Sequence, residues 1–75
     1  VDGREVDFVV TERMQPIAFV ECKTADAPVG TGLRYLRRRF PAVTSWQVSA
    51  TGTRDFVDAD GIRVAPATVL LRELV

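Results

Sequence analysis

The sequence contains no histidine, which excludes histidine-based catalysis and most zinc sites. Its single cysteine excludes an internal disulfide and fits a reducing compartment, so we expect a cytoplasmic location. No apolar run approaches the roughly 20 residues of a membrane-spanning helix, and no signal peptide is recognisable. We therefore expect no membrane partner.

An excess of charge is also lacking, because ten basic residues balance ten acidic ones. The chain as a whole is therefore no polycation, and any contact with nucleic acid must come from a local patch. Its 75 residues, 47% of them hydrophobic and 27% charged, indicate one small globular domain. A domain of this size buries only about 60% of its unfolded surface, so its stability is marginal without help.

Two acid-bearing strands organise what is present. Glu5–Val10 and Phe19–Lys23 are predicted as strands, and the polar, proline-terminated stretch Thr11–Pro16 is predicted as the hairpin loop between them. We take Met14 as the centre of the turn. This motif hairpin, residues 5–23, is the candidate functional core of the chain.

With this register, Asp7 lies opposite Glu21, and Glu5 lies opposite Lys23. Opposed residues share a face of the sheet, as do alternate residues along a strand, so all four side chains project from one surface. A purely structural interpretation stays open for two of them. Glu5 and Lys23 would then form an exposed ion pair contributing under about 1 kcal/mol, and Asp7 would lie on a solvated sheet face.

Three carboxylates and one ammonium favour binding of a divalent cation, because like charges at opposed positions repel. Mg²⁺ takes oxygen ligands, usually one or two carboxylates, with water and a substrate phosphate completing the shell. Asp7 and Glu21 are the predicted ligands of Mg²⁺ or Mn²⁺, and the backbone carbonyl of Cys22 is a candidate third ligand. Lys23 is placed to hold or activate the attacking water. The Cys22 side chain alternates away from the acids and is expected in the core.

A helix is predicted from about Thr31 to Arg39, closed by Phe40-Pro41, after a loop rich in small residues. Its arginines could grip a phosphate backbone near the acids, although charge runs are commonly just solvated helix faces. The candidate nucleic-acid-binding residues are Arg34, Arg37 and Arg38.

The alternating stretch Val43–Ala50 predicts a strand with Trp46 and Val48 toward the core. Gln47 lies on its opposite face and is a possible accessory residue of the acid cluster if this strand neighbours the hairpin.

The last third of the chain predicts short elements. Phe56-Val57 indicates a weak strand, and Asp58–Gly61 a turn, which is favoured over a calcium loop because the rest of an EF-hand is missing. A short strand, Ile62–Ala65, leads to Pro66 at the first position of a helix. That helix, Ala67–Leu74, is expected to turn Val69, Leu70 and Leu74 toward the core.

The motif, Asp7 followed by Glu21-Cys22-Lys23, resembles that of the PD-(D/E)XK nuclease superfamily. The predicted class is α/β with a mixed sheet, in the order β-β-α-β-β-α. This order fits a partial restriction-endonuclease-like core whose opening helix and first strand would precede residue 1.

A closer resemblance covers nearly the whole chain. The segments that carry it are Gly3–Val9, Val20–Thr24, Gly32–Leu36 and Gly61–Pro66. In order and spacing they are similar to a C-terminal domain of unknown function that follows the AAA+-type core of many prokaryotic ATPases. The resemblance implies that residues 1–75 are a single C-terminal domain of a larger ATPase. Gly30-Thr31-Gly32 lacks the Gly-Lys pair of a phosphate-binding loop, so ATP would bind only in that upstream domain.

Two functions follow as expectations. The first is Mg²⁺- or Mn²⁺-dependent hydrolysis of phosphodiester bonds in DNA. The second is a non-catalytic module for docking, nucleic-acid binding or dimerisation beside the ATPase. Because the missing first strand would leave a sheet edge unpaired, we expect the fragment to form a homodimer or to need its upstream segment.

Overall fold

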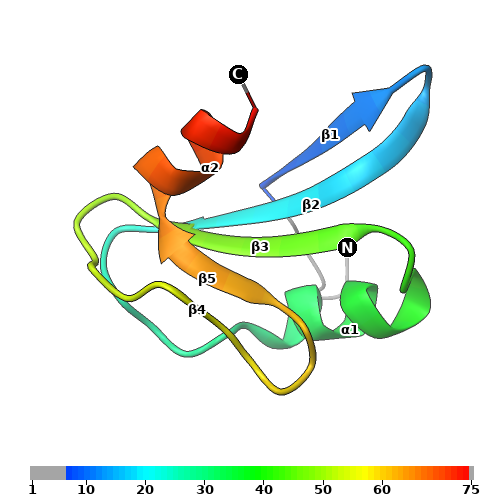
Figure 1. Cartoon of the computed structure of the whole chain (residues 1–75). Coiled ribbons are helices and arrows are strands. Elements are labelled where there is room, and N and C mark those ends of the chain that lie inside the picture. The colour runs from blue at the N-terminus through cyan, green and yellow to red at the C-terminus, as the bar shows by residue number, and fades with distance from the viewer. Residues whose placement is uncertain (1–6, 75) are drawn as a thin grey trace.

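The structure, a computed structural model, describes residues 7–74 (Figure 1). Within this range, five strands form one mixed sheet in the order β1-β2-β3-β5-β4, and two helices pack on it. The elements are β1 (Phe8–Glu12), β2 (Gln15–Lys23), α1 (Thr31–Arg39), β3 (Thr44–Ser49), β4 (Phe56–Val57), β5 (Arg63–Pro66) and α2 (Ala67–Glu73). The predicted α/β class with a mixed sheet is confirmed. The predicted order counted four strands, and the fifth is the two-residue β4, which forms where the weak strand was expected.

Both faces of the sheet are covered, each by one helix (Figure 1). On one face, Leu70 of α2 packs against a cluster that includes Val20, Trp46 and Val48. On the other, Leu33 of α1 packs against a cluster that includes Phe19 and Val64. Trp46, Val48 and Leu70 are therefore in the core as predicted.

The end of α2 departs from the prediction. Leu74 was expected on the apolar side, but it is 51% exposed. The helix ends at Glu73, so Leu74 lies just past its last turn, beyond the sheet surface that Leu70 covers. Pro66, predicted as the first helical residue, is the last residue of β5 and caps the helix that begins at Ala67.

The hairpin has the predicted register but a shorter loop. Phe8 pairs with Val20 and Val10 with Ala18, as expected if Met14 is the centre of the turn. A bulge then shifts the register, and the strands continue to Glu12 and from Gln15. The loop is therefore Arg13-Met14 and not Thr11–Pro16, and both turn residues have positive φ, 52° and 67°.

Strand direction brings the motif residues to one edge of the sheet. β2, β3 and β5 are parallel and end together, and the antiparallel β1 begins there. We call this side the carboxyl edge. Asp7 just before β1, Lys23 at the end of β2 and Ser49 at the end of β3 all lie there. In residues 7–74, no helix is long and apolar enough to cross a membrane.

Candidate functional site

Asp7 and the Glu21-Cys22-Lys23 segment meet through the backbone. The Cys22 N–H donates a hydrogen bond of 2.5 Å to Asp7 Oδ2. In a strand the N–H and C=O of one residue point to the same side, so the Cys22 carbonyl also faces the side where Asp7 lies. The carboxylate of Asp7 and the backbone oxygen proposed as a ligand are thus brought to the same side of β2.

Glu21 and Lys23 lie on one face of β2, the face covered by α1. Lys23 Nζ is 3.2 Å from Glu21 Oε1, and the exposed fractions of the two side chains are 36% and 15%. The largely shielded carboxylate of Glu21 is therefore compensated by one ammonium. The acid and the lysine lie on the same face, as the alternation of β2 predicts.

Gly30 gives Glu21 room at the start of α1, a role that was not predicted from the sequence. A Cβ on Gly30 would lie 2.9 Å from both Glu21 carboxylate oxygens, closer than real Cβ atoms come. Gly30 is the N-cap residue of α1, and the positive end of a helix dipole favours a carboxylate at this position. The sequence signal that points to it is a small residue directly before the predicted helix.

Because β3 neighbours β2, Gln47 lies next to Glu21 across their parallel pairing. It is 2% exposed, and its amide is fully used. Its Oε1 accepts a bond from Gly30 N, 3.3 Å, and its Nε2 donates to the carbonyls of Ala27 and Pro28, 2.9 and 3.3 Å. Gln47 therefore holds the segment before α1 against the sheet.

The groups proposed as ligands, two carboxylates and one backbone carbonyl, are oxygen ligands of the type that a hard divalent cation prefers. Two carboxylates and one carbonyl are within the usual protein contribution to a Mg²⁺ shell, which keeps several waters. Glu5, the further acid predicted here, lies outside the described residues. In residues 7–74, no three side chains of the types His, Cys, Asp and Glu form a group suited to hold a metal ion.

The Cys22 side chain is exposed, so its predicted place in the core is wrong. It does point to the face covered by α2, but the buried cluster under this helix ends at Val20 on β2. Local desolvation raises the pKa of the Cys22 thiol, and the negative charges of Asp7 and Glu21 raise it further. Both acids are thus close enough to influence one thiol.

The arginines of α1 have protein partners. Arg34 forms ion pairs with Asp58, at 3.1 Å, and with Asp60. Arg37 donates to the carbonyls of Asp60, 3.1 Å, and Pro41, 2.7 Å. Arg38 is exposed. The nucleic-acid role predicted for Arg34, Arg37 and Arg38 stays a prediction, but two of the three guanidinium groups also fasten α1 to the 58–61 turn.

That turn forms as predicted. Asp58 Oδ1 accepts bonds from the amides of Asp60 and Ile62, both at 2.9 Å, and Gly61 has φ +83°. The carboxylates of Asp58 and Asp60 are thereby committed to the backbone and to Arg34.

Comparison of this chain with protein-family models, with curated proteins and with solved structures finds no match. The interpretation of the site therefore depends on its geometry and chemistry.

Proposed function

We propose that this domain hydrolyses phosphodiester bonds of DNA with the help of Mg²⁺ or Mn²⁺, as a nuclease-like domain with a partial restriction-endonuclease-like core. The observation that carries the proposal is the Cys22 N–H to Asp7 hydrogen bond, because it joins the two halves of a motif that lie 15 residues apart. The resemblance in sequence adds the further proposal that the domain follows the AAA+-type core of a cytoplasmic ATPase.

Each residue has a defined role in this proposal. Asp7, Glu21 and the Cys22 carbonyl would hold the cation, which would supply charge stabilisation and lower the pKa of a bound water. Lys23, beside Glu21, orients the attacking water. The attacking water gives up one proton as its oxygen bonds to phosphorus, one P–O ester bond breaks, and the leaving oxygen takes up one proton. Gln47 keeps the segment next to Glu21 in place.

A non-catalytic docking module is the second candidate, and the exposed apolar surface of the hairpin favours it. Phe8, Val9 and Ile17 are 45%, 42% and 41% exposed, and β1 is an edge strand. Apolar side chains on both faces of an edge strand are typical of a strand that pairs with another segment. On this account Lys23 and Glu21 would be a structural ion pair.

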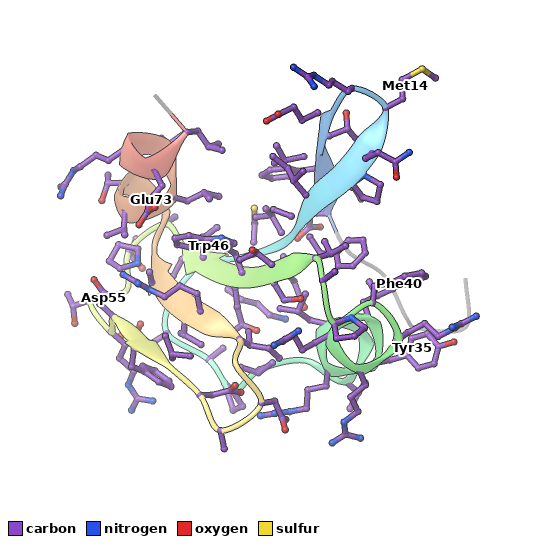
Figure 2. All side chains as sticks on the ribbon, turned by 45° about the vertical axis from the view of Figure 1, so that its right-hand side comes forward. Met14, Tyr35, Phe40, Trp46, Asp55 and Glu73 are labelled. Carbon is purple, nitrogen blue, oxygen red and sulfur yellow. The ribbon has the colours of Figure 1, made fainter. Side chains whose placement is uncertain are left out.

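Nicking of supercoiled plasmid in Mn²⁺ separates the two functions. The wild-type chain should convert the plasmid to open circles, and Asp7→Ala should not. Glu73→Ala is the matched control, because it removes an exposed acid from α2 (Figure 2), the helix on the sheet face opposite the one that carries Glu21. If the wild type leaves the plasmid intact, or if Asp7→Ala cuts as fast as Glu73→Ala, the catalytic proposal is wrong.

A further inference from the structure

The loop that follows β3, residues 50–54, lies directly beside the end of β2. Ala50 N donates to Lys23 O at 3.0 Å. Thr51 donates to Thr24 O through both its amide, 2.9 Å, and its hydroxyl, 2.7 Å. The loop is thereby part of the carboxyl edge, the side of open α/β sheets at which ligands bind.

Asp26 fixes the far half of this loop. Its carboxylate accepts bonds from the amides of Thr53, 3.2 Å, and Arg54, 3.3 Å. Gly52 makes this closure possible, because a Cβ there would collide with the Asp26 carboxylate and with Ser49 Oγ. The backbone at Arg54 is therefore held at a defined position relative to the end of β2.

Arg54 carries a positive charge on this loop. It is exposed, and within residues 7–74 its guanidinium has no ion pair. The adjacent carboxylate of Asp55 is 2.5 Å from Arg63 Nη2, so its negative charge is already compensated. Arg54 differs in this respect from Arg34 and Arg37, whose guanidinium groups are bound by the 58–61 turn.

We propose that the 50–54 loop is a nucleic-acid-binding element in which Arg54 contacts a backbone phosphate beside the scissile one. The substrate class rests on the proposed function. The planar guanidinium of Arg54 can bind two phosphate oxygens at once. The backbone that carries it is already ordered by the bonds to Asp26. Asp7 and Glu21 repel a phosphodiester, and Arg54 offsets this repulsion on the edge where the DNA must approach.

The test measures binding of a fluorescein-labelled DNA duplex by anisotropy, over about 50 to 200 mM salt. All variants carry Asp7→Asn, so that the probe stays intact, and a gel verifies this. Arg54→Gln is compared with Arg54→Lys and with Arg72→Gln. Arg72 is the matched control, because it is an exposed arginine in the last turn of α2, on the other face of the sheet. Thermal midpoints verify that the variants are equally folded.

Arg54→Gln should reduce the slope of log affinity against log salt by about 0.9, the value of one phosphate contact on duplex DNA. Over this fourfold salt range, the parent protein, which carries Asp7→Asn alone, then loses roughly 3-fold more affinity than the Arg54→Gln variant. Arg54→Lys and Arg72→Gln should keep the parental slope. Equal slopes for Arg54→Gln and Arg72→Gln, or no binding by any variant, would overturn the inference.

The result is independent of catalysis. If the wild type nicks plasmid but Arg54→Gln keeps the parental slope, the nuclease proposal stands and the inference fails. If the wild type does not cut but Arg54→Gln alone lowers the slope, the inference stands and the catalytic proposal fails.

Discussion

Replacing Gln47 by methionine should destabilise the domain far more than the same change at another glutamine. Methionine is close to glutamine in shape but lacks the amide, so the change removes the bonds to Gly30 N, Ala27 O and Pro28 O. These groups are part-buried, so each one left without a partner costs about 1 kcal/mol, the low end of the range for unsatisfied groups. The free energy of unfolding should therefore fall by roughly 2–3 kcal/mol.

Thermal unfolding followed by circular dichroism measures this effect. For a domain of this size, about 1 kcal/mol corresponds to 4–8 °C, so Gln47→Met should lower the midpoint by roughly 10–20 °C. Gln15→Met is the matched control, because Gln15 is an exposed residue at the start of β2. If the two variants melt within a few degrees of each other, Gln47 does not hold the segment before α1 by hydrogen bonding.

Three further predictions concern the surface of the hairpin. The raised pKa of Cys22 should make alkylation of the thiol by iodoacetamide slow at neutral pH, because only the thiolate reacts. Asp7→Asn should accelerate the alkylation, because it removes one negative charge near the thiol. Equal rates in both proteins would show that Asp7 does not act on the thiol. The same thiol links stability to pH: its contribution is full below the ordinary thiol pKa and is lost as pH rises through the raised value. Within residues 7–74, β1 is the outer strand of the sheet, and Phe8 and Val9 are exposed, so the chain should be dimeric at micromolar concentration in sedimentation, and Val9→Lys should shift it to monomer. A wild-type chain that sediments as a monomer and unfolds cooperatively would contradict this prediction.

Local patterns were sufficient for the elements and for the pairing of the motif. Helix α1 spans the predicted residues Thr31–Arg39, because Gly30 and Phe40-Pro41 delimit it in the sequence. The register of Phe8 with Val20 and Val10 with Ala18 follows from the turn centre at Met14, and Asp7 lies within hydrogen-bond distance of the Cys22 N–H. The loop length was not predictable, because Arg13 and Met14 both have positive φ although neither is the Asn or Gly that such turns favour.

Contacts between distant segments account for the other differences. The arginines of α1 find their partners at Asp58 and Asp60, more than 20 residues away, and no local signal indicates such a pairing. Alternation along β2 fixes the face to which Cys22 points. The alternation does not predict how far α2 extends over that face. The exposure of Cys22 depends on this tertiary packing, so it could not be predicted from the local sequence pattern.

Thermal melts with and without Mn²⁺ test the central claim, that Asp7 and Glu21 form a metal site. Binding at one hundred times the dissociation constant stabilises a folded protein by roughly 2.7 kcal/mol. The midpoints of the wild type and of the control Glu73→Gln should therefore rise by about 10 °C or more in Mn²⁺, and that of Asp7→Asn should change little. Without metal, Asp7→Asn should be at least as stable as the wild type, because the amide oxygen can still accept the Cys22 N–H bond and one negative charge near Glu21 is gone. If Mn²⁺ shifts all three proteins equally, or shifts none, and Asp7→Asn is less stable without metal, Asp7 is a structural acid and the site binds no metal.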